Sequence, residues 1–285
     1  MANSYAWEDV EAARRDLIGH GPRDRFLEKI CKGAIKVGRD KTNPIRGNLV
    51  ASALRELATH VLHSLAPEDE VRRCIWFKQA ADTNTVTRSQ RARYIVQAGL
   101  PNDFVKGKLK VDASAMAKPL LAAMDKLHKA THVRADTVVY KGSAVREMLY
   151  NVLTEIHTLL EDAANARHSI KDAVSTELQH AVFESLILDT IQELDELSTH
   201  TRVDGHIIDE IKVRRLNAVE IEYCVTGHVE VELQYGSNSD VAHDIGMRSD
   251  DSYPYKARVI AAAGKPLDID AEAIRLSVDT SSFYE

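Results

Sequence analysis

The chain of 285 residues is 44% hydrophobic, 28% charged and 6% aromatic, an ordinary globular composition that excludes a disordered or fibrous protein. It has no apolar run near the roughly 20 residues of a membrane helix and no apolar signal region at its start, so we expect a cytoplasmic protein without membrane contact. The net charge of −6 is uneven, because residues 1–200 hold 28 Lys and Arg against 27 Asp and Glu, whereas residues 201–285 hold 9 against 16.

The first two hundred residues show the spacing of apolar side chains that is typical of amphipathic helices. In residues 48–65, for example, Leu49, Ala53, Leu57 and Val61 recur every four residues. We expect helices at residues 7–18, 22–38, 48–65, 89–100, 113–130, 143–163 and 168–199, the last with room for one break. The intervening segments 38–48, 79–88 and 131–141 are expected to be loops.

Near residue 205 the spacing of the apolar residues changes from that of an amphipathic helix to every second residue. Residues 219–226 and 228–235 alternate between apolar and polar side chains, residues 236–240 (GSNSD) favour a turn, and residues 252–262 and 273–279 are further strand candidates. This pattern predicts an antiparallel β-meander with one buried face. The fold class is therefore α+β, with a helical bundle at 1–165, a connecting helical segment at 166–204 and a small β module at 205–285.

Two histidines at the end of the helix 113–130 are the first candidate site. His128 and His132 are four residues apart, so they share a helix face, and Lys126, Lys129 and Arg134 lie beside them. Imidazoles can transfer protons and fixed cations can stabilise a phosphorane, which is the chemistry of metal-independent RNA cleavage. In the alternative interpretation, His132 only caps the helix. No third metal ligand is identifiable, and no cofactor is expected.

Other charged residues are weaker candidates. Arg55 and His60 are about 140° apart on a regular helix and so do not face one site, although Arg55 alone could face the cleft of His132. The basic stretch that contains Arg88, Arg91 and Arg93 could guide an RNA backbone. Glu210 and Lys212 form the short acidic-x-Lys string of metal-dependent nucleases, which also arises often by chance. The cysteines Cys31, Cys74 and Cys224 form no CxxC pair, which favours free, reduced thiols.

The segments ALRELATHVLHSLAP, KLHKATHVR and AVREMLYNVLTEIHTLL follow one another in an order that resembles the HEPN superfamily, helical domains of prokaryotic nucleases and nucleotide-binding proteins. HEPN ribonucleases characteristically carry an arginine four to six residues before a histidine. Here Lys126 stands six residues before His132, and lysine lacks the planar fork that suits phosphate. The resemblance implies a homodimer with its site across the dimer.

The C-terminal segments VTGHVEVELQYGSNSD, DDSYPYKAR and SVDTSSFYE resemble a β module of predicted PIWI-associating and PIN-type nucleases from defence loci. This resemblance implies a component of a bacterial anti-phage system. We therefore expect an HEPN-like ribonuclease that acts on RNA or another nucleic acid. The alternatives are a non-catalytic adaptor or sensor that docks a partner nuclease or ATPase, and a metal-dependent nuclease that uses Glu210 and Lys212.

Overall fold

The structure, a computed structural model, describes residues 5–20, 24–188 and 191–285. The chain divides into two compact units, and the predicted α+β class is confirmed. The first unit comprises residues 1–98 and 105–167, and the second comprises residues 99–104 and 168–285. None of the described helices is long and apolar enough to cross a membrane.

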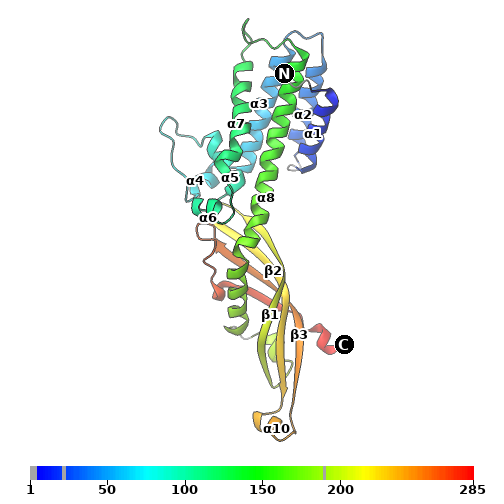
Figure 1. Cartoon of the computed structure of the whole chain (residues 1–285), viewed down its shortest axis with the longest axis vertical. Coiled ribbons are helices and arrows are strands. Elements are labelled where there is room, and N and C mark those ends of the chain that lie inside the picture. Colours follow the sequence, from blue (N-terminus) through cyan, green and yellow to red (C-terminus); the bar gives the residue numbers. More distant parts are fainter. Residues whose placement is uncertain (1–4, 21–23, 189–190) are drawn as a thin grey trace. The chain divides into compact units, whose positions relative to one another are not determined.

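Helices build the first unit (Figure 1). Their bounds are α1 Trp7–His20, α2 Arg25–Arg39, α3 Arg46–Leu65, α4 Glu68–Arg73, α5 Arg88–Gln97, α6 Asn102–Gly107, α7 Ala113–Ala130 and α8 Gly142–Leu188, of which α6 and α8 continue into the second unit. The central helix is α3, which packs against α2, α5 and α7. Its apolar stripe fills the core of the unit, since Val50, Leu54 and Leu57 are fully buried.

The sequence prediction for α3 was wrong at one position. Leu49, expected in the apolar stripe, is 42% exposed. The buried stripe instead starts at Val50, which lies about 100° further around the helix. A four-residue spacing advances by about 400° and therefore drifts away from the core within a few turns.

The helices predicted at 143–163 and 168–199 form one continuous helix, α8, of 47 residues, as far as Leu188. No glycine or proline interrupts the chain between Ser143 and Leu188, so no residue breaks the ladder of backbone hydrogen bonds. Buried residues such as Ala163, Ala166 and Ile170 keep the spacing of a helix across the gap that was predicted between residues 163 and 168. The stretch predicted as helical to residue 199, with room for one break, continues beyond α8 in the short α9, Gln192–Asp195; residues 196–199 are not helical, and residues 189–190 lie outside the described residues.

The second unit contains an antiparallel sheet with the strand order β1-β2-β3-β4. The strands are β1 His200–Leu216, β2 Glu220–Tyr235, β3 Met247–Ala262 and β4 Arg275–Val278. The predicted alternation is confirmed in β2, where Ile221, Tyr223 and Val225 are buried and the residues between them reach the other face. The predicted turn at 236–240 carries the short helix α10, Asn238–Ala242, which Ser237 and Asp240 cap reciprocally.

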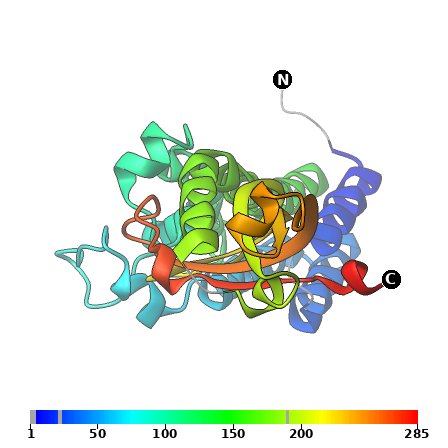
Figure 2. The same cartoon turned by 90° about the horizontal axis from the view of Figure 1, so that it is seen from below.

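The C-terminal part of α8 packs beside the sheet of its unit (Figures 1 and 2). His206 of β1 contacts this helix, since its Nε2 lies 3.0 Å from the Gln179 carbonyl oxygen and its ring stacks on Phe183 at a centroid distance of 5.6 Å. Its Nδ1 lies 3.0 Å from the hydroxyl of Tyr255 on β3. Burial lowers the pKa of His206, which favours the neutral imidazole in these contacts.

Candidate functional site

The histidine pair lies at the end of α7. His128 is in the last turn of the helix, and His132 follows two residues after Ala130, the last helical residue. The two rings lie edge to face with a centroid distance of 5.6 Å, and both side chains are exposed. The pair is therefore open to a ligand from solvent.

A buried asparagine anchors the loop that carries His132. Asn48 is 1% exposed. Its Nδ2 donates to the carbonyl oxygens of Ala130 at 2.7 Å and Thr137 at 3.0 Å, and its Oδ1 accepts from the Val139 amide at 3.2 Å. The Thr137 hydroxyl in turn donates to the carbonyl oxygen of His132. The start of α3 thus fixes the backbone on both sides of His132.

The residue before Asn48 allows this close approach. A Cβ atom added to Gly47 would lie 2.5 Å from the Cβ of Val139, closer than van der Waals contact permits. Neither Asn48 nor Gly47 was predicted from the sequence to be part of the site. The only available signal was a polar asparagine within an apolar helical stripe, which is consistent with many roles.

Arg55 lies on the same side of α3 as this anchor. It follows Asn48 by seven residues, almost two full turns, so the two side chains leave the same face about 10 Å apart along the helix axis. The Arg55 side chain is 33% exposed, and its Nη2 lies 2.9 Å from a carboxylate oxygen of Glu56. Arg55 therefore remains accessible on the side of α3 that holds the histidine loop.

His60 has a different role, in agreement with the helical angle that separates it from Arg55. Its Nε2 contacts the carboxylate of Asp24, and its ring packs on Phe26 at a centroid distance of 4.6 Å. Asp24 is the N-cap of α2, and the contact with His60 lowers the pKa of this carboxyl group. His60 joins α3 to the start of α2.

Lys126 is separated from the histidines. It precedes His128 by two residues, which places the side chains about 160° apart around α7. Lys126 lines a groove between α7 and α8 instead. Arg134, in the loop after α7, is exposed. The structure therefore brings His128 and His132 together and directs Lys126 elsewhere.

The three arginines of α5 differ in accessibility. Arg88 is exposed at the first turn of the helix. Arg91 is 3% exposed, and its guanidinium donates to the carbonyl oxygen of Ala66 and to the Glu68 carboxylate at 3.2 Å. Arg93 lies over the ring of Trp76, 4.1 Å from its centroid. Contrary to the sequence expectation, Arg91 is thus part of the core and presents no charge to a nucleic acid.

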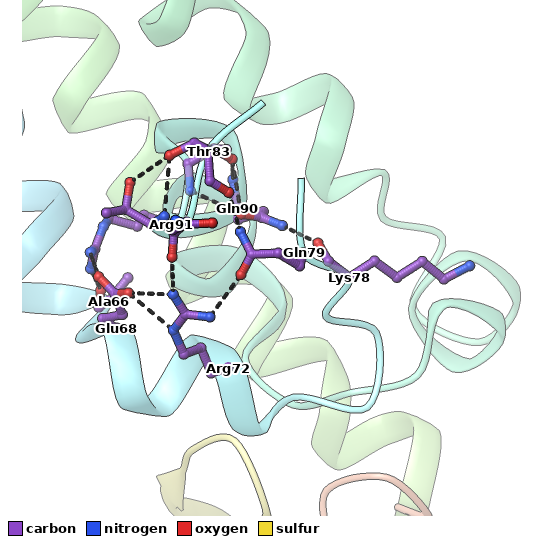
Figure 3. A network of polar contacts seen from close by, with 11 residues as sticks. Ala66, Glu68, Arg72, Lys78, Gln79, Thr83, Gln90 and Arg91 are labelled. Carbon is purple, nitrogen blue, oxygen red and sulfur yellow. Dashed lines mark hydrogen bonds and ion pairs between the residues drawn. The ribbon is translucent and has the colours of Figure 1, made fainter. Parts of the chain in front are cut away.

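A network of polar contacts explains the burial of Arg91 (Figure 3). The Glu68 carboxylate also accepts from Nη2 of Arg72 at 2.6 Å. Arg72 donates further to Gln79 Oε1 at 2.8 Å and to the Asn84 carbonyl oxygen at 2.5 Å. The network ties the loop before α5 to α4, and burial lowers the pKa of Arg91 without removing its charge.

Two carboxylates of β1 contact basic side chains. Glu210 pairs with Lys212 at 2.5 Å, and a carboxylate oxygen of Asp209 lies 2.9 Å from Nδ1 of His228. Among the described residues, no group of three or more His, Cys, Asp or Glu side chains could hold a metal ion. All three cysteines are free, and burial raises the pKa of Cys31 and of Cys74 to about 12.

Comparison with known protein families matches the chain in two segments. Residues 21–156 match one family model and residues 163–284 match a second, and both are described as predicted pPIWI-associating nuclease. No curated protein and no solved structure matches the chain. Together the two matched segments cover most of the chain, which is therefore similar to the predicted pPIWI-associating nucleases.

Proposed function

We propose that the chain is a ribonuclease that cleaves RNA without a metal ion, at a site formed by His128 and His132 with Arg55 and Arg134 beside it. The observation that carries the proposal is the pair of exposed imidazoles at the end of α7, whose ring centroids lie 5.6 Å apart, with His132 on the loop that Asn48 anchors. The family matches support the coarser function of a nuclease. Lys126 is not included in the site, because it lies on another side of α7.

The chemistry needs one imidazole in each protonation state. The neutral imidazole takes the proton of a ribose 2′-hydroxyl, whose oxygen attacks the adjacent phosphorus and forms a P–O bond. The protonated imidazole gives its proton to the 5′-oxygen as the bond from phosphorus to that oxygen breaks. The products are a 2′,3′-cyclic phosphate and a free 5′-hydroxyl. The guanidinium of Arg134 or Arg55 would stabilise the additional negative charge on the phosphorane.

This assignment makes DNA a poor substrate, because DNA has no 2′-hydroxyl. It also predicts a bell-shaped dependence of the cleavage rate on pH, since the base must be neutral and the acid protonated. The resemblance to HEPN domains and to proteins of defence loci supports the further proposal of a homodimeric component of an anti-phage system.

The test uses the purified full chain with labelled RNA and with DNA of the same sequence, each with and without EDTA. We expect RNA cleavage that survives EDTA and leaves cyclic phosphate ends. His128→Ala and His132→Ala should each lower the rate by about 10²–10⁴-fold. His180→Ala, which changes an exposed histidine of α8, is the matched control and should retain the activity.

Cleavage that EDTA abolishes, or that is unaffected by either histidine substitution, would refute the proposal. The replacement of the expected arginine by Lys126 favours a second candidate, a non-catalytic adaptor that docks a partner nuclease or ATPase. The result that would establish the adaptor is an absence of cleavage of either nucleic acid, together with a stable complex with such a partner.

A further inference from the structure

One face of the sheet in the second unit is lined by polar and charged side chains and reaches solvent. The even-numbered residues of β2 point to this face, and the strand register places the even-numbered residues of β3 beside them. On β1 the face carries the exposed side chains of Arg202, Ile207, Glu210 and Lys212. We call this surface, from the level of Glu222 to the level of Glu232, the open face.

Charge divides the open face into two halves. The half towards α10 (Figure 1) carries the carboxylates of Glu230 and Asp250, which form no ion pair with any described residue. The other half carries Lys256 and Arg275, which also lack an ion pair within the described part of the chain. Most other charged residues of the face pair with one another, namely Arg202 with Asp204, Lys212 with Glu210, and Arg215 and Arg258 with Glu222.

A row with two apolar side chains separates the halves. Ile207, His228 and Pro254 are cross-strand neighbours in this row. Ile207 is 54% exposed, and Pro254 is exposed as well. Asp209 lies 2.9 Å from Nδ1 of His228, so its carboxylate is already in contact with a side chain of its own chain.

The charges lie at equal distances on the two sides of this central row. Neighbouring rows of one face are about 6.6 Å apart along the strands. Lys256 is one row from the centre on one side, and Glu230 is one row from it on the other. Arg275 and Asp250 are each two rows away, again on opposite sides. A rotation by 180° about an axis along the central row, across the strands, therefore exchanges the basic half with the acidic half.

We propose that the open face binds the open face of a second copy of this chain, about a twofold axis along the row of Ile207. Lys256 then lies opposite the partner's Glu230 and the partner's Asp250, and Arg275 lies beside the partner's Asp250. Ile207 packs on the partner's Ile207 at the axis. Each of these contacts forms twice, as in any isologous interface.

The size of the open face indicates a weak complex. The rows from Glu222 to Glu232 extend over about 33 Å and three strands over about 14 Å, which gives about 480 Å² per copy. Two copies bury about 1,000 Å², less than the roughly 1,200–2,000 Å² of stable complexes and typical of transient ones. Since the contacts away from the axis join exposed charges, salt should weaken the complex.

This interface is separate from the homodimer that the HEPN resemblance implies across the histidine site of the first unit. The open face belongs to the second unit, and its pairing requires no cleavage of RNA. The test therefore reads contact at the axis itself, which neither the ribonuclease activity nor a dimer through the first unit produces.

A cysteine on the axis provides this readout. Ile207→Cys is made in the full chain with Cys224→Ser, which leaves only the buried Cys31 and Cys74 as native thiols. Under mild oxidation at high protein concentration and low salt, we expect a disulfide between two copies, seen on a non-reducing gel as a band of twice the mass. Salt at about 1 M should reduce its yield about fivefold.

Ile260→Cys in the same background is the matched control. Ile260 is 40% exposed on the same face, but it lies three rows from the axis. It would be about 40 Å from its counterpart, too far for a disulfide, so its yield should be at least about fivefold lower.

Charge reversal tests the pairing of the halves in the Ile207→Cys chain. Lys256→Glu with Arg275→Glu makes both halves acidic, and Glu230→Lys with Asp250→Lys makes both halves basic. Either double variant alone should cross-link about fivefold less, because like charges meet. An equal mixture of the two should restore the cross-link, because acidic halves then meet basic halves at both contacts. Lys265→Glu, at an exposed lysine beyond the end of β3, should cross-link normally.

Three results would overturn the proposal. They are a yield from Ile207→Cys no higher than that from Ile260→Cys, a cross-link that charge reversal leaves unchanged, and a mixture that cross-links no better than its components. Circular dichroism checks that each variant is folded. If a double variant does not fold, the salt dependence of the Ile207→Cys cross-link decides, and a yield unchanged by salt would also overturn the proposal.

Discussion

The anchor at Asn48 allows the organisation of the candidate site to be tested through stability. Asn48→Ala removes three hydrogen bonds, to the backbone of Ala130, Thr137 and Val139. Each is worth about 1 kcal/mol net, so their loss costs about 3 kcal/mol. Alanine is a better helix former than asparagine by up to about 0.7 kcal/mol, which offsets part of that cost. The expected destabilisation is about 2 kcal/mol, or a fall in Tm of about 4–8 °C for a unit of this size.

Two measurements check this expectation. Urea denaturation gives the change in the free energy of unfolding, and hydrogen exchange should show faster exchange of the backbone amides of residues 131–139. Asn84→Ala is the matched control, because Asn84 is exposed and Arg72 bonds only to its backbone oxygen. If Asn48→Ala cost less than about 0.5 kcal/mol and left the exchange unchanged, the loop would not depend on this anchor.

Three further predictions concern buried groups. Arg91→Ala should lower the free energy of unfolding by about 2–3 kcal/mol, since charged hydrogen bonds are lost from the core, whereas Arg88→Ala should leave urea denaturation unchanged; equal effects would contradict the buried network. Gly227→Ala should cost about 3 kcal/mol in the same assay, because the added Cβ would lie 2.0 Å from the Ile207 carbonyl oxygen, and an unchanged midpoint would argue against this close approach of β1 and β2. Burial lowers the pKa of His206, so its contribution to stability should be complete above about pH 6.5, the pKa of an unfolded histidine, and be lost as the pH falls towards the folded pKa. His206→Gln should flatten the fall in stability between about pH 7.5 and 5, and an identical pH profile would refute this role.

Local sequence patterns were sufficient to predict the secondary structure of those elements that bury one face. The alternation around Tyr223 predicted β2 and its buried face, because a side-chain period of two is a property of the strand itself. The apolar stripe of α3 was also recognisable, although Leu49 was assigned to it wrongly. The prediction of two separate helices, with a break between residues 163 and 168, was wrong. A polar stretch such as residues 161–169 can continue a helix as well as end one when it contains no glycine or proline.

For the candidate site, the sequence by itself was sufficient to relate residues that lie within a few positions of one another on the same helix. His128 and His132 are four residues apart, and their proximity follows from the helix, as does the angle that separates Arg55 from His60. Lys126 could have been separated from His128 by the same helical arithmetic.

Only the tertiary structure decided which charges remain accessible and which residues hold the site. Arg91 belongs to the same basic stretch as Arg88 and Arg93. Its guanidinium, however, is buried and donates hydrogen bonds to the backbone of Ala66 and the carboxylate of Glu68. Asn48 bonds to residues 82 to 91 positions away along the chain, and the groove that Lys126 lines forms only where α7 meets α8. Such relations depend on how separate elements pack, and a pattern within one segment carries no information about them.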